Sequence, residues 1–394
     1  MARREAADAE QRDRDRRVGE LGERDQLAVC LRALSKDAGP GLSRFSLAAK
    51  NSSLAASALP PHRVGQEEAK TFARSMFSRG HGDIERLLPI FDNVDIKNRY
   101  FCVPAEWFER DHTFPEKNAL YVEHALDLSE KAARRALDRV GARPDEVGAV
   151  FFVSTTGIST PSIDSKLIFR LGLSEHTRRV PIWGLGCSAG AAGIARAAEH
   201  ARLYPDQLVL LVAVELCGLT FQQGDRSKSN LISTSLFADG AAAVLLGGTT
   251  GPEVLGGYST TWPDTEDVMG WDLVETGLKV QLSKSIPNIV REKFRDNLEE
   301  ACNSLGLDFD ELEHFVLHPG GSRVLDAFEE ALGLQAGGLT TSRDVLRDCG
   351  NMSSVTVLFI LERFLEGGEF AKGDLGVLSA MGPGFSAEHV FFRC

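Results

Sequence analysis

Two stretches of this chain, separated by about 165 positions, run through the same order of helix, glycine, acidic pair and apolar strand. Segment 130–147 (EKAARRALDRVGARPDEV) resembles segment 292–312 (EKFRDNLEEACNSLGLDFDEL). The strand, turn and helix that follow each segment end in Leu-Gly-Leu, at 171–173 and at 332–334. Repetition at a nearly constant offset predicts two copies of one supersecondary unit. Chance similarity between two generic helix–strand units is the alternative.

Near-continuous apolar runs mark the expected central strands. Segments 147–153 (VGAVFFV), 209–214 and 241–246 have the composition of strands that are covered on both faces. Before the first of them, apolar residues at helical spacing predict a helix that Asn118 caps and that Gly141 ends. The alternation of helices and strands predicts a layered α/β fold.

The domain organisation follows from the repeat and from one change in composition. Residues 1–48 are rich in Arg, Asp and Glu, and we expect a poorly ordered or helical N-terminal extension that adds nothing to the core. The two repeated units then predict an N-terminal half over 49–265 and a C-terminal half over 266–394.

Composition and charge exclude several classes of function. The chain carries 44 basic and 56 acidic side chains, so a net charge of −12 disfavours nucleic-acid binding. No apolar run approaches the ~18–20 residues that span a bilayer, and the N-terminus lacks a secretory apolar segment. The seven cysteines are scattered and contain no C-x-x-C, which disfavours a disulfide framework or a metal site and indicates a reduced, cytoplasmic setting.

Cys187 is the candidate nucleophile. It lies in Gly-Leu-Gly-Cys-Ser-Ala-Gly at 184–190, directly before a helical segment, and the glycines permit a tight turn. A thiol at a helix N-terminus feels the positive end of the helix dipole, which favours the thiolate. A small core residue among Gly and Ala is the alternative interpretation.

Two further polar residues, His318 and Asn351, stand at the ends of predicted elements. His318 ends an apolar strand and precedes Pro-Gly-Gly, so we expect it at the edge where α/β sheets hold ligands. Asn351 begins a helix, 164 positions after Cys187, and is either a simple N-cap or a donor to a substrate oxygen. If the repeat is real, Cys187 and Asn351 occupy pseudo-symmetric helix starts and meet His318 in one cleft.

Four motifs carry a resemblance to a known family. GLGCSAG, HPGG, CGNMSS and MGPGFSAE, spread over residues from about 50 to 394, resemble the chalcone synthase superfamily of type III polyketide synthases. The segments NRYF, STTGISTPSID and SLFADG are most similar to bacterial long-chain alkylpyrone and alkylresorcinol synthases. The resemblance implies the thiolase fold, with two pseudo-symmetric halves in αβαβα layers, a homodimer, and no metal or organic cofactor.

The resemblance also implies a reaction and roles for particular residues. A fatty acyl group would pass from acyl-CoA to Cys187, and malonyl-CoA would be decarboxylated beside His318 and Asn351. Repeated condensation and ring closure would follow. The other implied residues are the gatekeeper Phe237, the acyl-tunnel positions Thr156, Thr160 and Cys217, the CoA-binding candidates Arg86, Lys97 and Arg99, and the cyclisation-cavity loop Gly382, Pro383 and Gly384.

The same residue types leave rival functions open. A ketoacyl-ACP synthase of the third type shares the Cys, His and Asn but condenses once on a carrier protein. A papain-type cysteine hydrolase uses the same three residue types in the same chain order. A thiolase is disfavoured because Met381-Gly382 stand where its second cysteine is needed, and a non-catalytic acyl-binding protein is the most distant alternative. Starter length, number of extensions and mode of ring closure stay open.

Overall fold

A computed structural model describes residues 54–78, 84–248 and 251–394. The expected extension over 1–48 lies outside these residues. The first sheet has five strands, and its order along the sheet is β1, β7, β6, β4, β5. Their bounds are β1 Ala55–Ala58, β4 Val147–Val153, β5 Arg178–Ile182, β6 Leu208–Leu216 and β7 Asp239–Leu246.

The second sheet repeats four of the five strands of the first in the same order. Its order is β8, β13, β12, β11, and the bounds are β8 Glu253–Thr261, β11 Leu312–Leu317, β12 Leu375–Gly382 and β13 Ser386–Arg393. In each sheet the two strands β4 and β6, or β11 and β12, are parallel, and the next two pairings are antiparallel. Only β5 has no counterpart among the described strands. This shared topology confirms the duplication that the sequence repeat predicts.

The sheets also show where the two halves divide. Strand β8 pairs with β13 over its whole length, although it precedes residue 265. The change from one sheet to the other therefore falls between Leu246 and Glu253, earlier than the predicted boundary at 265.

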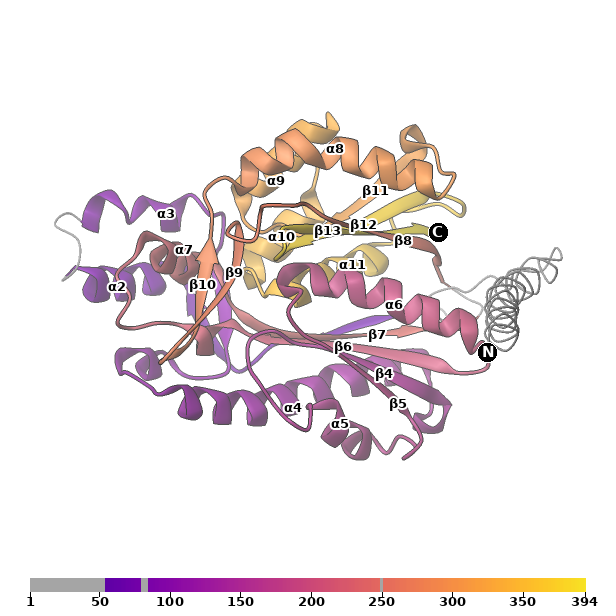
Figure 1. Ribbon diagram of the computed structural model, residues 1–394, viewed down its shortest axis with the longest axis horizontal. Helices are drawn as coiled ribbons and strands as arrows, with labels where there is room; N and C mark the ends of the chain where they lie inside the picture. The colour runs from indigo at the N-terminus through magenta and orange to yellow at the C-terminus, as the bar shows by residue number, and fades with distance from the viewer. Residues whose placement is uncertain (1–53, 79–83, 249–250) are drawn as a thin grey trace, which may run out of the picture. The chain divides into compact units, whose positions relative to one another are not determined.

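Helices and sheets alternate in five layers (Figure 1). Helices α6 (Ala189–Leu203) and α11 (Thr356–Gly367) fill the layer between the sheets, in one continuous apolar core. α4 (Phe114–Val140) and α5 (Asp164–Leu171) cover the outer face of the first sheet, and α8 (Ile286–Ser304) and α9 (Ser322–Leu332) cover that of the second. The arrangement is the αβαβα thiolase fold that the resemblance implies.

Small residues let the central helices approach each other. Gly190 near the start of α6 contacts the backbone of Ser354, and an added Cβ would overlap the Ser354 carbonyl oxygen. The Ala-rich sequence of α6 leaves most of its side chains buried against both sheets. The starts of α6 and α11 are therefore brought side by side in the middle of the fold.

Helix α4 begins and ends with clear local signals. Thr113 caps it, with Glu116 completing a capping box, and Gly141 ends it at φ 65. The prediction that Asn118 caps this helix is wrong, because Asn118 lies inside the helix. Its amide instead makes two hydrogen bonds of 2.8 Å with the backbone of Ile158.

Shorter elements surround one end of the central layer. They are β2 (His62–Gly65) paired with β3 (Asn98–Phe101), the hairpin β9 (Met269–Val274) and β10 (Gly277–Leu282), α2 (Gln66–Phe77), α3 (Pro89–Asp92), α7 (Lys228–Leu236) and α10 (Thr340–Cys349). The 3₁₀ turns are η1 (Ile84–Arg86), η2 (Ala105–Glu109), η3 (Pro144–Glu146), η4 (Gly186–Ser188), η5 (Cys217–Thr220), η6 (Phe309–Glu311) and η7 (Ser353–Val355). None of the helices within the described ranges has the length and apolarity that a bilayer crossing requires.

Candidate active site

Cys187, His318 and Asn351 line one cavity of about 400 Å³. Each stands at the end of an element: Cys187 in η4 just before α6, His318 directly after β11, and Asn351 between α10 and η7. The pseudo-symmetry of the halves explains why Cys187 and Asn351 meet, since both precede the two central helices. The three residues that the sequence singled out are thus brought together by the fold.

Cys187 occupies a tight turn under the cavity. Gly186 before it has φ 48, a conformation that favours glycine. The Cys187 Sγ lies 3.4 Å from the Oγ of Ser353, which itself adopts φ 51. Burial raises the pKa of the Cys187 thiol to about 12, and the contact with Ser353 opposes that shift.

The backbone of His318 is held by a hydrogen bond, whereas its imidazole ring makes none within the described residues. Its N–H donates to the carbonyl oxygen of Ser379 on β12 at 2.9 Å. Within the described part of the chain, neither ring nitrogen has a hydrogen-bond partner, and the residue is 4% exposed. Burial lowers the pKa of His318 to about 3, so the ring alone is neutral.

Asn351 is held from three sides. Its Nδ2 donates to the Gly320 carbonyl oxygen at 2.8 Å, and its Oδ1 accepts the N–H of Ser353 at 2.8 Å. Its main chain accepts from Ala238 and donates to Leu236, each at 2.9 Å. Asn351 is therefore not the N-cap of α11, which begins at Thr356, and its amide is oriented by the loop after His318.

Burial opposes the thiolate that the helix N-terminus favours at Cys187. Burial disfavours a lone thiolate at Cys187 and a lone imidazolium at His318, as the two pKa shifts show. Transfer of the thiol proton to the imidazole would form both ions together, and their mutual attraction would offset part of the cost of burying each charge. The isolated side chains are neutral, and the charged pair depends on the two forming together.

Phe237 stands between two cavities. It lines the 400 Å³ cavity and a second cavity of about 730 Å³, and among the described residues it is the one that lines both. Cys217 lies on the wall of the larger cavity, among aromatic side chains of α2, β3 and η2 and beside Phe221, which follows η5. The gatekeeper position and one acyl-tunnel position therefore line the same cavity.

The structure places the other two acyl-tunnel candidates away from both cavities. Thr156 lines neither large cavity, and its hydroxyl donates to Glu215 at 2.9 Å and accepts the N–H of Leu216. Thr160 lies on a separate groove of about 550 Å³ beside Trp183, at the edge of the first sheet.

Of the three CoA-binding candidates, only Arg86 lines the catalytic cavity. Arg86 lines the 400 Å³ cavity, whereas Lys97 is exposed and lines neither large cavity. Arg99 is 2% exposed and donates to backbone carbonyl groups, so it does not reach a surface phosphate. Three exposed cations that no sequence motif marks line the same cavity: Lys228, Lys284 and Arg323. They lie on separate elements and share no sequence motif.

The Gly-Pro-Gly loop supports the cysteine turn rather than lining the cavity. A Cβ on Gly382 would lie 2.5 Å from the carbonyl oxygen of Leu185, and Pro383 packs on Gly186. The cavity wall instead receives the neighbouring side chains of Met381 and Phe385.

Glu215 is a buried residue that the sequence analysis did not identify. Its carboxylate accepts the Thr155 N–H and the hydroxyls of Thr156 and Ser354 at 2.9, 2.9 and 2.6 Å. Burial raises its pKa to about 7. The residue ties the end of the first sheet to the segment that follows Asn351, and a run of apolar residues before it was the only sequence signal.

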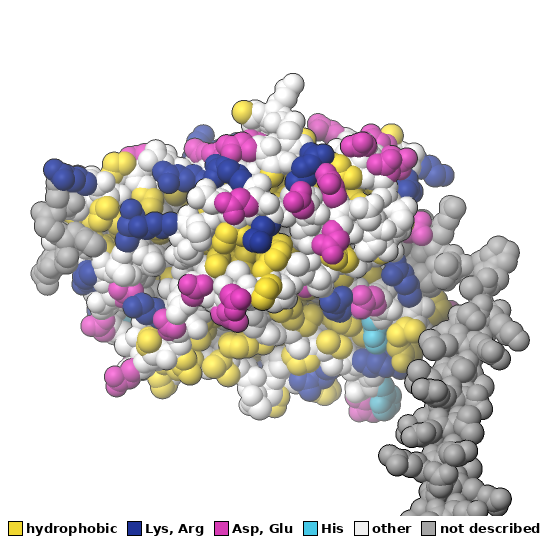
Figure 2. Space-filling view, turned by 45° about the horizontal axis from the view of Figure 1, so that its top comes forward, with side chains coloured by type: hydrophobic (Ala, Val, Ile, Leu, Met, Phe, Trp, Pro, Cys, Tyr) yellow, Lys and Arg dark blue, Asp and Glu magenta, His cyan; other side chains and the backbone are white. Residues whose placement is uncertain are grey.

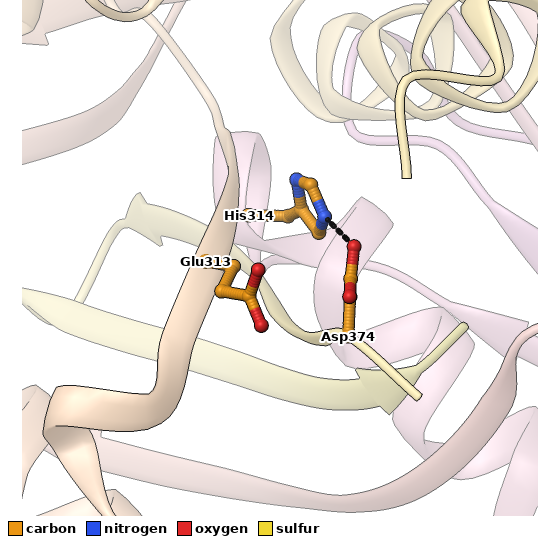
Figure 3. Close-up of side chains that lie close together, drawn as sticks. All are labelled: Glu313, His314 and Asp374. Atoms are coloured by element: carbon orange, nitrogen blue, oxygen red, sulfur yellow. Dashed lines mark hydrogen bonds and ion pairs between the residues drawn. The ribbon is translucent and has the colours of Figure 1, made fainter. Parts of the chain in front are cut away.

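A second polar cluster lies at the other end of β11. Glu313, His314 and Asp374 lie close together (Figure 3), and His314 Nε2 is 2.9 Å from Asp374 Oδ2. Asp374 also accepts the Ala371 N–H at 2.6 Å, and His314 lowers the pKa of the carboxyl. These contacts tie His314 and the Ala371 backbone to the residue just before β12.

Comparisons with known proteins agree with this geometry. The N-terminal domain of the chalcone and stilbene synthases matches residues 47–250, and their C-terminal domain matches residues 254–394. The chain therefore belongs to the chalcone and stilbene synthase family and is a type III polyketide synthase, an acyltransferase with the thiolase fold. This membership excludes the papain-type hydrolase and the other rival readings.

Three relatives show how far the likeness extends. A chalcone synthase-like protein of Bacillus subtilis (strain 168) is 43% identical over 349 residues, covering 85% of this chain and 96% of the relative. The 1,3,6,8-tetrahydroxynaphthalene synthase of Streptomyces peucetius is 35% identical, covering 89% and 95%. The solved 1,3,6,8-tetrahydroxynaphthalene synthase of Streptomyces coelicolor superposes with a TM-score of 0.83 at 29% identity, covering 89% and 99%.

Proposed function

We propose that this synthase loads a long-chain fatty acyl group from acyl-CoA, extends it with malonyl-CoA and closes the chain to an alkylpyrone or alkylresorcinol. The supporting observation is the second cavity of about 730 Å³ beside Phe237, which is lined by Phe72, Phe101, Phe108 and Phe221. Burial of methylene groups against such a wall contributes about 0.8 kcal/mol each. The alpha-pyrone synthesis protein Pks18 of Mycobacterium tuberculosis is 28% identical, whereas relatives named as a 1,3,6,8-tetrahydroxynaphthalene synthase and a phloroglucinol synthase are 35% and 29% identical, so the cavity carries the proposal.

The loading step uses Cys187 and His318. The thiol proton passes to His318 as sulfur attacks the acyl-CoA carbonyl carbon, and the oxyanion that forms accepts hydrogen bonds in the cavity. The carbon–sulfur bond to CoA then breaks, and the CoA thiolate leaves with a proton from His318. The acyl group remains on Cys187 as a thioester.

The extension step uses His318 and Asn351 as donors. Malonyl-CoA loses carbon dioxide, and the electron pair of the broken bond becomes an enolate whose oxygen accepts from both side chains. Phe237 presents an apolar surface to the departing carboxylate, which favours its loss. The enolate carbon attacks the acyl carbon on Cys187, the thiolate departs, and the lengthened chain returns to Cys187 for the next round and finally for ring closure.

Four cationic side chains on the catalytic cavity suit the phosphates of CoA: Arg86, Lys228, Lys284 and Arg323. The face drawn in Figure 2 carries Lys and Arg side chains among acidic and apolar ones. Changing Lys284 and Arg323 together to glutamine is expected to raise the KM for acyl-CoA about tenfold and leave kcat unchanged, because exposed cations bind the substrate and its transition state equally. Steady-state kinetics measure this, with Lys97→Gln as the matched control. An unchanged KM would contradict this assignment.

A ladder of starters tests the proposed substrate class. The purified chain is incubated with malonyl-CoA and acyl-CoA thioesters of increasing chain length, and products are identified by mass. We expect long-chain thioesters to give the highest kcat/KM and products that combine one starter with more than one malonyl unit. Preference for acetyl- or malonyl-CoA as starter would overturn the long-chain assignment, and a single condensation would contradict the repeated extension.

We also propose that a second copy covers the free edge of the first sheet. Strand β5 ends the sheet, and near it Ile158 and Trp183 are 44% and 56% exposed beside the groove that contains Thr160. An unpaired edge with large exposed apolar side chains is typical of an interface. Light scattering is expected to give twice the chain mass of 42.9 kDa, and a mass of 42.9 kDa would contradict a homodimer.

The proposed chemistry draws on side chains and two CoA thioesters, so no metal or organic cofactor takes part in it. Turnover that is unchanged after dialysis against EDTA would support this part of the proposal, and a loss restored by a metal ion would contradict it.

The six cysteines in the described part of the chain are free, in keeping with the predicted cytoplasmic location.

A further inference from the structure

Arg99 is a buried cation without a carboxylate partner. It lies on β3, is 2% exposed, and forms no ion pair with any residue in the described ranges. Burying an unpaired guanidinium is costly, so such a residue persists only where surrounding dipoles compensate for it. Its Nη1 donates to the carbonyl oxygens of Thr234 and Phe237, the latter at 3.2 Å.

Those two carbonyl groups belong to the C-terminal end of α7. Thr234 lies in the last turn of the helix and Phe237 is its C-cap residue. The last carbonyl groups of a helix lack intrahelical donors and carry the negative end of the helix dipole, so a cation placed there is stabilised. Arg99 therefore caps α7 at the residue that separates the two cavities.

The Arg99 side chain also packs against the backbone next to Asn351. The aliphatic part of Arg99 packs on Gly350, where an added Cβ would lie 2.7 Å from the Arg99 Cγ. The next residue, Asn351, is joined to the α7 end by its two main-chain hydrogen bonds to Leu236 and Ala238. The Arg99 side chain thus contacts both backbone segments that these hydrogen bonds join, the end of α7 and Gly350.

We infer that Arg99 is a positioning residue that keeps the Phe237 ring and the Asn351 amide in fixed positions relative to each other. By doing so it couples malonyl decarboxylation to condensation. The inference rests on the proposed function. An enolate formed beside a displaced ring or amide would meet a proton before it reaches the acyl group on Cys187. The thioester would then leave as acetyl-CoA, with no carbon–carbon bond formed.

The test compares coupling in Arg99→Ala, Arg99→Lys and the unchanged protein. For Arg99→Ala we expect acyl loading on Cys187, measured by intact mass, to stay close to that of the unchanged protein. The ratio of condensed product to released acetyl-CoA should fall at least about tenfold, the scale of a small displacement of reacting groups. Because Arg99 lines the 730 Å³ cavity, added guanidinium should restore the ratio in Arg99→Ala, and urea should not.

The outcomes separate this inference from the proposed function. If Arg99 were only structural, loading, decarboxylation and condensation would fall in equal proportion and guanidinium would not change the ratio, which would overturn the inference. Should Arg99→Ala fail to fold, Arg99→Lys, which keeps the charge with a single donor nitrogen, carries the same comparison. An unchanged protein that condenses no acyl-CoA with malonyl-CoA would instead overturn the proposed function. Arg63→Ala, an exposed arginine on β2, is the matched control.

Discussion

Replacement of Asn351 by alanine is expected to slow malonyl-CoA decarboxylation by about 10²–10³-fold, the usual cost of removing one oxyanion donor. The Asn351 amide lines the cavity with Cys187 and His318, and it is oriented by Gly320 and by the Ser353 N–H. Acyl loading needs Cys187 and His318 but no enolate, so it should be affected far less. Release of labelled carbon dioxide measures the first step, and intact mass measures the second.

Asn118→Ala provides the control for this result. Asn118 also makes two hydrogen bonds to backbone, but it lies on α4 and does not line the catalytic cavity. Its loss should leave decarboxylation unchanged. Equal damage to loading and decarboxylation in Asn351→Ala would contradict the separate roles given to Asn351 and Cys187.

Replacement of Cys187 by alanine is expected to lower product formation by at least about 10⁴-fold, because no other group at this position can hold the growing chain. Malonyl decarboxylation should continue at a reduced rate, since His318 and Asn351 remain in place. Product analysis and trapping of the acyl-enzyme measure the two effects. Cys302→Ala, which alters a buried cysteine of the C-terminal core, should leave both unchanged.

Cys217 is the alternative thiol that this experiment must consider. It is buried on the wall of the larger cavity, and burial raises its pKa well above the ordinary value. An acyl group found on Cys217 in the Cys187→Ala protein, with products still formed, would transfer the role of nucleophile to that residue.

Local signals in the sequence predict much of the fold. The two Leu-Gly-Leu segments place Gly172 and Gly333 at the ends of α5 and α9, at φ 71 and 68, where glycine is favoured. The apolar run 147–153 coincides with β4. Such features are determined by a few adjacent residues, so they can be predicted without knowledge of the tertiary structure.

Features that depend on tertiary contacts were harder to predict. Nothing within residues 253–261 indicates that this strand pairs with β13, about 130 positions later. Arg99 is a charged residue in a short strand, and only the folded chain shows that its partners are carbonyl groups of α7. Lys228, Lys284 and Arg323 come together on the cavity from separate elements.

Peptide mapping of the working enzyme tests the central claim most directly. The protein is mixed with a long-chain acyl-CoA and labelled malonyl-CoA, quenched during turnover and digested, and the acylated peptides are identified by mass. We predict that the peptide containing Cys187 carries both the starter and its malonyl-extended forms. Extended chains on a different residue, or an unextended starter as the only adduct while product accumulates, would contradict the claim.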